Sequence, residues 1–363
     1  LMAHAATSPK YALISPTFKR PDEVTEFLQS LTALDYPQSG FEIILGDGTP
    51  GDELRPELAP YLDQLPLQIY YEEYLPVSDA RNRAASLATA QYFIFLDSDC
   101  IIPPGYLRAI DAFLETHPDT TLFGGPDAAS ADFTDLQKAI NFSMTSFLTT
   151  GGIRGGQNTL TSYQPRGFNM GMSAELFRSV GGYDENFVCG EDVELSLRLQ
   201  KASAISRFIP EAHVYHKRRA TLKQFRRQVF RFGAARPLLA KAHPGNLKLT
   251  HLFPLVFTLY RHLTAILAVV GIFYFHESMY AMPFALYVLY MIAVFISALS
   301  KEGLAVAVLG VGGVLADPHH QIKGRRVLEA RQQGLQALVG VHHLHVMIPK
   351  PTPPRLARIA RKA

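Results

Sequence analysis

Two aspartates, Asp97 and Asp99, end a run of apolar residues, and two carboxylates at this spacing could bind a cation. Residues two apart in an extended chain point to the same side, so the two carboxylates are expected to converge. Converging carboxylates need a cation, and oxygen ligands of this kind suit Mg²⁺ or Mn²⁺. The pair therefore predicts a divalent metal site, and the alternative is the polar end of a buried strand.

Further charged residues follow at comparable places in the chain. Asp47 ends a second apolar run, FEIILGD, and Arg81 lies in the sequence ARN near the start of a helical pattern. Glu191 and Asp192 open the segment GEDVELSLRL, which predicts another helix. Neighbouring residues on a helix point in different directions, so only one of these two carboxylates is expected to face a substrate. The alternative is that both only stabilise the helix N-terminus, where negative charge is favoured.

The first hundred residues alternate between strand and helix patterns. Buried strands are expected at 11–17, 41–47, 67–73 and 91–99, with helical patterns at 21–34 and 77–90. Such alternation predicts right-handed crossovers and an α/β fold with a mostly parallel, doubly wound sheet. Ligands of such sheets bind beyond the carboxyl ends of the strands. Four side chains are expected to meet at that edge: Thr17, Asp47, Asp97 and Asp99.

The order of these elements resembles the inverting family 2 glycosyltransferases, which have the GT-A fold. The resemblance rests on SPTFKRP, GDGTPGD, ARNRAASLATAQYFIFLDSD, RGFNMGMSAELFRSVGGYDENF, GEDVELSLRL and HKRRATLKQF, and covers roughly residues 10–233. It implies a GT-A, Rossmann-like sheet with helices on both faces. It also implies transfer of a sugar, with inversion, from a nucleotide-diphosphate donor.

The resemblance implies a catalytic base and a metal site. Asp192 would be the base, and a carboxylate within hydrogen-bond reach can deprotonate an attacking hydroxyl. Asp99 would bind Mg²⁺ or Mn²⁺ directly, and His216 would complete the site, with His213 as the alternative. A divalent cation stabilises the negative charge that gathers on the departing diphosphate.

The resemblance also implies donor contacts. Thr17 would border the nucleotide, and Asp47 would hydrogen-bond the base, most often uracil. Arg81 would lie near the ribose and diphosphate, and Asp97 near the ribose or a metal-bound water. Gly46 stands where the family often has a further aspartate. The expected donor is a UDP-sugar.

The acceptor side is expected around Phe147–Asn169, a stretch rich in glycine and polar residues. Its length predicts a long mobile loop, and such loops are often functional. Within it, Arg154 and Arg166 could meet a lipid diphosphate or only solvate the loop. Asn169 and Glu191 are further candidates for contacts on this side.

A basic segment follows the catalytic elements. Lysines and arginines alternate with apolar residues after residue 217, which is typical of an amphipathic helix on an anionic membrane surface. A nucleic-acid-binding patch is the alternative, but we favour the membrane because apolar spans follow directly. The sequence QVFRF (228–232) resembles the Gln-x-x-Arg-Trp motif of processive synthases, with Phe in place of Trp. An interfacial helix is the preferred interpretation.

Two apolar segments, 252–275 and 278–299, are each long enough to cross a bilayer. Their connection lacks Lys and Arg while both flanks are basic, which predicts a transmembrane hairpin with both ends cytoplasmic. Arg261 and His262 lie either near an end of the first span or toward the acceptor path. The apolar segment 303–316 is short, and we expect it to be re-entrant or interfacial.

These observations predict four regions. They are a GT-A domain at 10–216, an interfacial region at 217–250, transmembrane or re-entrant segments at 251–316 and a basic cytoplasmic tail at 317–363. Two cysteines without a repeated pattern, Cys100 and Cys189, indicate a reducing compartment, with Cys100 as a packing residue. No apolar signal-peptide core lies near the N-terminus, so the front domain is expected in the cytoplasm.

The expected activity is that of a metal-dependent, inverting glycosyltransferase of the hexosyltransferase type. We expect it at the bacterial inner membrane, with a lipid-linked glycan acceptor used for surface polysaccharide and no nucleic-acid partner. One alternative is a processive polysaccharide synthase. Another is a non-catalytic membrane scaffold with a degenerate transferase domain.

Overall fold

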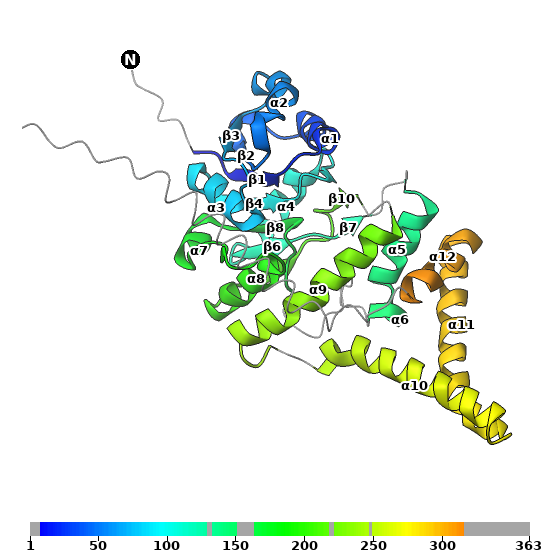
Figure 1. The fold of residues 1–363 in the computed structure, drawn as a ribbon. Helices are drawn as coiled ribbons and strands as arrows, with labels where there is room; N and C mark the ends of the chain where they lie inside the picture. The colour runs from blue at the N-terminus through cyan, green and yellow to red at the C-terminus, as the bar shows by residue number, and fades with distance from the viewer. Residues whose placement is uncertain (1–7, 129–132, 151–162, 218–220, 247–248, 316–363) are drawn as a thin grey trace, which may run out of the picture.

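The computed structural model describes residues 8–128, 133–150, 163–217, 221–246 and 249–315 (Figure 1). Its first part is an α/β domain built on a central sheet. Its last part is a pair of long helices that projects from this domain. Arg154 and the predicted basic tail at 317–363 lie outside the described residues.

The central sheet has seven strands in the order β3-β2-β1-β4-β8-β6-β9. Neighbouring strands pair in parallel except at β8, which is antiparallel to β4 and β6. The mostly parallel sheet predicted from the sequence is therefore confirmed. The strands are β1 (Tyr11–Thr17), β2 (Phe41–Asp47), β3 (Leu67–Tyr71), β4 (Tyr92–Leu96), β6 (Leu122–Gly124), β8 (Asn169–Ser173) and β9 (Ser206–Phe208).

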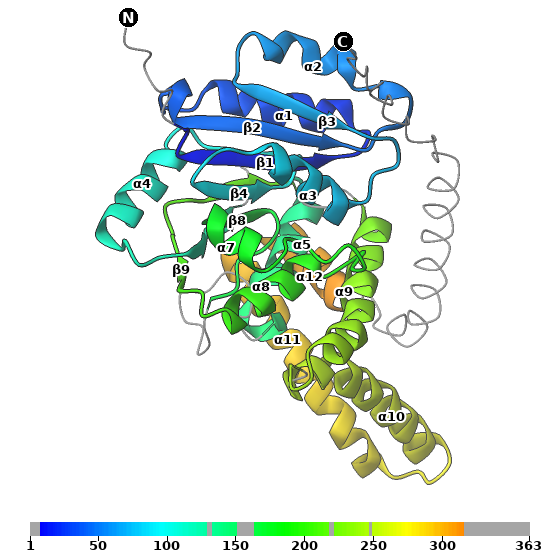
Figure 2. The same ribbon diagram turned by 90° about the vertical axis from the view of Figure 1, so that its left-hand side faces the viewer.

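Helices cover both faces of this sheet, as expected of the fold (Figures 1 and 2). One hydrophobic core joins the sheet to α1 (Pro21–Thr32), α2 (Arg55–Leu62) and α4 (Tyr106–Thr116). The other core joins it to α3 (Val77–Leu87), α7 (Ala174–Ser179) and α8 (Glu191–Lys201). Because both faces are covered, the central strands are almost continuously apolar, which is typical of parallel strands. Short 3₁₀ helices lie at Gln38–Gly40 (η1) and Pro50–Asp52 (η2).

A second, small sheet fixes the approach of a distant segment to the end of β4. It contains β5 (Cys100–Ile101), β7 (Asp127–Ala128) and β10 (Val214–His216), with β10 in the middle. In the antiparallel pairing of β10 with β5, His216 lies opposite Cys100. Through this pairing His216 comes next to the aspartates that follow β4.

The helix α9 (Leu222–Ala242) crosses the α/β domain after β10. Thr221 and Gln224 form a capping box at its start, which satisfies backbone donors that would otherwise lack partners. Near its start, Phe225 packs against α5 (Asp135–Thr145). Near its end, Leu239 packs against Val193 of α8. The basic segment is thus a helix docked on the α/β domain along its length.

The loop predicted at 147–169 is shorter than expected. Its first four residues form α6 (Phe147–Thr150), and Asn169 already belongs to β8. Residues 163–168 connect to β8 and lie in the described part of the chain, whereas 151–162 do not. An extended residue, Ser146 (φ −64°, ψ 138°), separates α6 from the end of α5.

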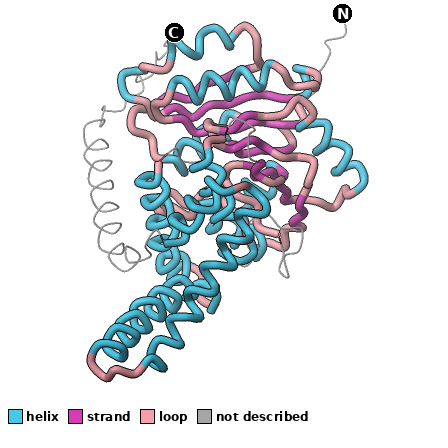
Figure 3. Tube along the Cα trace, turned by 90° about the vertical axis from the view of Figure 1, so that its right-hand side faces the viewer, coloured by secondary structure: helices cyan, strands magenta, loops and turns pink. Residues whose placement is uncertain are grey.

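The two long helices form a hairpin that extends away from the sheet (Figures 2 and 3). They are α10 (Phe253–Phe273) and α11 (Met282–Glu302), preceded by η3 (Leu249–Leu252) and joined through η4 (Ser278–Ala281). Both are long and apolar enough to cross a membrane by length and composition. Arg261 and His262 lie in the first half of α10, where His262 Nδ1 is 2.8 Å from the carbonyl oxygen of Thr258.

The segment after the hairpin folds back onto the α/β domain. It forms α12 (Leu304–Leu315), which packs against both α5 and α11. Ala307 of α12, Val294 and Ala298 of α11 and Phe142 of α5 form one hydrophobic cluster. Its predicted re-entrant or interfacial position in a membrane stays a prediction.

A pH-dependent stability is expected from Asp79, in the first turn of α3. Burial, together with the nearby charge of Glu185, raises the pKa of this carboxyl to about 6 from 3.8. Because this pKa is higher in the folded than in the unfolded protein, the Asp79 carboxyl contributes favourably to folding stability below pH 3.8. That contribution is lost as the pH rises through 6. Asp79→Asn should therefore raise the free energy of unfolding by about 1 kcal/mol at neutral pH and by almost nothing near pH 4. Chemical denaturation at both pH values measures this, and equal effects would contradict it.

Candidate active site

A buried arginine joins three elements at the carboxyl edge of the sheet. Arg81 of α3 is only 2% exposed. Its Nη2 donates to Asp97 Oδ1 at 2.7 Å, just after β4, and its Nη1 donates to Glu191 Oε1 at 2.9 Å, at the start of α8. A buried guanidinium is costly unless it is paired, and two carboxylates meet that need here. Its charge also lies 5.2 Å from the ring centre of Tyr183.

The start of α8 turns its two acids in different directions, as predicted. Glu191 faces Arg81, whereas Asp192 Oδ2 accepts a hydrogen bond from the backbone N–H of Gly167 at 3.2 Å. Gly190 precedes them with a φ of +79°, and a Cβ there would lie 3.2 Å from Ala235 Cβ on α9. Burial raises the pKa of Glu191, the charge of Asp192 raises it further, and Arg81 opposes both.

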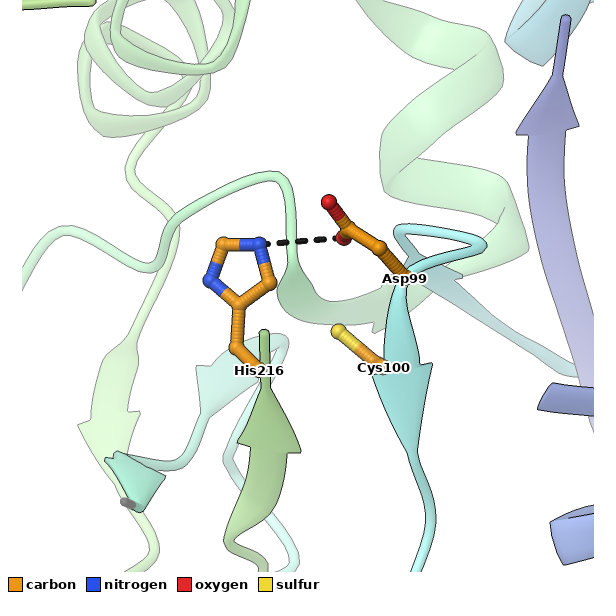
Figure 4. Close-up of side chains that lie close together, drawn as sticks. All are labelled: Asp99, Cys100 and His216. Atoms are coloured by element: carbon orange, nitrogen blue, oxygen red, sulfur yellow. Dashed lines mark ion pairs between the residues drawn. The ribbon is translucent and has the colours of Figure 1, made fainter. Parts of the chain in front are cut away.

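A cluster of side chains of types that can bind a metal ion lies where β10 meets β5 (Figure 4). The ligand atoms of Asp99, Cys100 and His216 all lie within 4.8 Å of one another. His216 Nε2 is 3.0 Å from Asp99 Oδ1, and the His216 ring stacks on Phe168. His213, the alternative considered from the sequence, instead has its ring against that of Tyr215. A buried carboxylate beside an imidazole suits a divalent cation such as Mn²⁺.

The sequence interpretation took Cys100 to be a packing residue. Its thiol is buried and Sγ lies 3.8 Å from the carbonyl oxygen of Phe168, so packing is part of its role. Its place in the cluster follows from the pairing of two very short strands, β5 and β10. No local pattern in the sequence signals such a pairing.

Two polar groups at the ends of β1 and β2 are buried without a partner in the described chain. They are Thr17 Oγ1 and Asp47 Oδ2, which neighbour each other because Thr17 pairs with Asp47 in the sheet. The other oxygen of Asp47 accepts from the backbone N–H of Thr49 at 2.9 Å. Burial raises the pKa of the Asp47 carboxyl, against the opposing effect of Thr49. Unpaired buried acceptors are costly, so a ligand that donates a hydrogen bond would stabilise this corner.

Gly46 has a steric explanation. A Cβ at this position would lie 2.4 Å from the backbone oxygen of Ala80, so α3 packs directly on the strand. An acidic side chain at this place would push α3 away from the strand. The close approach keeps Arg81 within reach of Asp97.

Asn169 lies beneath the site and not in its lining. Its Oδ1 accepts from the Tyr106 hydroxyl at 2.7 Å, and its Nδ2 donates to the carbonyl oxygen of Ala212 at 2.8 Å. Both ends of the side chain are therefore used within the fold. A contact of Asn169 with acceptor or donor stays a prediction.

One cleft of about 590 Å³ brings five of the predicted residues together. Arg81, Asp97, Glu191, Asp192 and His216 line it. Asp99 lies beside His216, and Thr17 and Asp47 are buried at the ends of β1 and β2.

One wall of the cleft was missed from the sequence. Residues of α9 line it, among them Gln224, Gln228, Arg231 and Arg236. Their spacing of three to five residues places them along one side of the helix. This spacing, together with the QVFRF sequence, could have indicated from the sequence that one side of the helix lines the cleft. The interfacial interpretation of this helix was therefore incomplete, because one face of α9 belongs to the cleft.

Comparison with known proteins identifies the domain. The family model described as glycosyl transferase family 2 matches residues 12–180. Residues 12–180 are a family 2 glycosyltransferase domain. The predicted family is confirmed, and with it the class of enzyme.

Relatives of this glycosyltransferase include the succinoglycan biosynthesis protein ExoA of Rhizobium meliloti (strain 1021). It is 26% identical over 246 residues, which are 66% of this chain and 73% of that protein. A pre-mycofactocin glycosyltransferase of Mycobacterium tuberculosis (strain ATCC 25618 / H37Rv) is 32% identical over 170 residues, which are 46% of this chain but only 35% of that protein.

A solved structure supports the GT-A fold of the glycosyltransferase. The mannosyltransferase PcManGT from Pyrobaculum calidifontis, in complex with GDP-Man and Mn²⁺, superposes with a TM-score of 0.52 at 16% identity. The match covers 92% of this chain and 88% of that chain. It therefore extends beyond the sheet to the helices that follow it.

The buried ion pairs of Arg81 predict a large loss of stability on their removal. Arg81→Met keeps a side chain of similar length but leaves Asp97 and Glu191 without their cation. Breaking a buried pair in this way typically costs about 3–5 kcal/mol. The matched control is Arg83→Met, an exposed arginine on the same helix, which should change stability by less than about 0.5 kcal/mol. Unfolding of both variants measures the difference, and equal small effects would refute the role given to Arg81.

Proposed function

We propose that this protein is a metal-dependent, inverting glycosyltransferase that moves a sugar from a nucleotide-diphosphate donor to a lipid-linked glycan. One observation carries the proposal above the others. Asp192 and His216 line the same cleft, and Asp99 lies beside His216. The candidate base and the candidate cation site thus face the same cleft, which is large enough for the reacting end of a sugar nucleotide.

Donor binding is proposed at the ends of β1, β2 and β4. The unpaired Asp47 Oδ2 would accept a hydrogen bond from the N–H of a base, for which uracil is our expectation, and Thr17 would border the nucleotide. Asp97 lines the cleft and would face the ribose. Arg81 would contribute positive charge near the ribose and diphosphate, while holding Asp97 in place.

The proposed chemistry is a single displacement. Asp192 accepts the proton of the acceptor hydroxyl as its oxygen attacks the anomeric carbon, and the bond from that carbon to the diphosphate oxygen breaks. The leaving nucleotide diphosphate keeps the electron pair. The N–H of Gly167 orients the Asp192 carboxylate for this step. Asp99 and His216 would hold Mg²⁺ or Mn²⁺, which when bound stabilises charge on the diphosphate.

The membrane role is proposed from the C-terminal helices. The exposed sides of α10 and α11 are rich in large apolar residues, which water would disfavour. Both ends of the hairpin lie toward the α/β domain (Figure 3), so a spanning hairpin would keep that domain at one membrane surface. We place it at the cytoplasmic face of a bacterial inner membrane. The regions 10–216, 217–250, 251–316 and 317–363 would then be the transferase domain, the interfacial helix, the membrane segments and the basic tail.

The lipid-linked acceptor fits this arrangement. A hairpin in the bilayer would hold the cleft close to membrane-anchored substrates. The Rhizobium meliloti relative is a succinoglycan biosynthesis protein, which supports a role in polysaccharide biosynthesis.

A processive polysaccharide synthase is the second candidate, favoured by a specific observation. Gln228, Arg231 and Phe232, which match the Gln-x-x-Arg-Trp motif except at the aromatic, all line the cleft. The length of the product separates the candidates, since one added sugar supports the first and a polymer the second. A non-catalytic scaffold would show no hydrolysis of nucleotide sugars.

The general-base role of Asp192 can be tested by Asp192→Asn. The amide cannot accept the proton, so kcat should fall roughly a thousandfold while donor binding changes little. The matched control is Glu175→Gln, an exposed acid in the first turn of another helix, α7, which should leave both unchanged. Transfer assays and calorimetric donor titrations give the two readouts. Normal turnover by Asp192→Asn would rule out this base.

The metal site can be tested by direct Mn²⁺ binding. Asp99→Asn and His216→Ala should each weaken Mn²⁺ binding at least about tenfold, because each removes a ligand from the cluster. Asp63→Asn, an exposed carboxylate outside the site, serves as the control. Chelation should also abolish transfer and added Mn²⁺ should restore it. Full activity of metal-free protein would contradict the proposed site.

A further inference from the structure

The cleft carries more positive charge than the proposed donor chemistry uses. Arg81 is neutralised by Asp97 and Glu191, and Arg20 pairs with Glu23 at 2.8 Å. Besides Arg227 and Arg231 of α9, Arg166 and Arg236 also line the cleft. The charges of Arg166 and Arg236 have no such explanation within the described chain.

Arg166 and Arg236 form a half-buried pair of like charges. Neither side chain makes a hydrogen bond or an ion pair with any residue of the described chain. Burial lowers the pKa of Arg236, and the nearby charge of Arg166 lowers it further, against the opposing charge of Asp192. Two neighbouring cations partly withdrawn from water repel each other, and a bound anion would offset that cost beyond what the nearby Asp192 supplies.

Their position is on the Asp192 side of the cleft. Arg166 directly precedes Gly167, whose N–H binds Asp192. Arg236 directly follows Ala235, which packs against Gly190 at the start of α8. Glu191 turns the other way, toward Arg81 and the strand ends where the donor is proposed. The two arginines therefore lie near the proposed base, Asp192.

We propose that Arg166 and Arg236 form a second phosphate site, which binds the phosphate that links the acceptor glycan to its lipid. The proposal rests on the proposed transferase function and adds the chemical class of the acceptor: a sugar carried on a phosphate or diphosphate. Guanidinium groups suit phosphate because their N–H donors match its oxygens in pairs. The helix α9 that carries Arg236 leads into the apolar hairpin, so a lipid in the bilayer would present its headgroup along this helix.

The test uses the full-length protein in detergent micelles with farnesyl monophosphate and its neutral counterpart farnesol as probes. Binding is titrated with and without saturating UDP and Mg²⁺, which fill the donor site. Wild-type protein should bind farnesyl monophosphate at least about tenfold more tightly than farnesol, and UDP should not displace it. Arg236→Ala and Arg166→Ala should each lose about tenfold for the phosphate probe, as expected for hydrogen bonds to a charged group, and keep the affinity for UDP.

The matched control is Arg226→Ala, which removes an exposed arginine of the same helix that lies outside the cleft. It should leave both affinities unchanged. Competition by UDP would mean that the arginines hold the donor diphosphate, and equal binding of the two probes would mean that no phosphate is recognised. Either result overturns the second phosphate site while leaving the transferase in place. A wild-type protein that binds no UDP and no other nucleotide would instead overturn the proposed function.

Discussion

The arrangement of the cleft depends on one buried cation. Arg81 holds the carboxylate after β4 and the carboxylate that opens α8, and it does so almost out of contact with water. Breaking a buried ion pair of this kind is strongly destabilising, because loss of either partner leaves an uncompensated buried charge. The pairing with Glu191 sets the direction in which α8 begins. That direction turns the next residue, Asp192, toward Gly167 and into the cleft.

Much of the fold could be predicted because its signals are local. Buried parallel strands are apolar runs that end in polar residues, and β1 and β2 match the predicted ranges 11–17 and 41–47. The edge where Thr17 and Asp47 meet followed from the rule that parallel strands end together. The metal cluster was harder, because His216 reaches Asp99 only through the two-residue strand β5. The resemblance to a family, and not a pattern, pointed to that histidine.

The helix α9 shows that composition alone reveals only part of a helix's surroundings. Its alternation of basic and apolar residues indicates a helix at a membrane surface, and the helix does lead into two apolar helices. Yet Phe225 and Leu239 anchor it on the α/β domain, and several of the residues between them line the cleft. Which face of an amphipathic helix meets a partner depends on contacts with α5 and α8, elements distant in the sequence. No local sequence pattern indicates such contacts.

The central claim is that this cleft binds a nucleotide-diphosphate sugar and passes the sugar to a lipid-borne acceptor. The most direct measurement is a screen of nucleotide-diphosphate sugars for release of free nucleotide by the purified full-length protein, with and without added bacterial membrane lipid. The account predicts release from a particular donor, with a uridine nucleotide expected, and a marked increase when lipid is added. Release from no donor, with or without lipid, would contradict it.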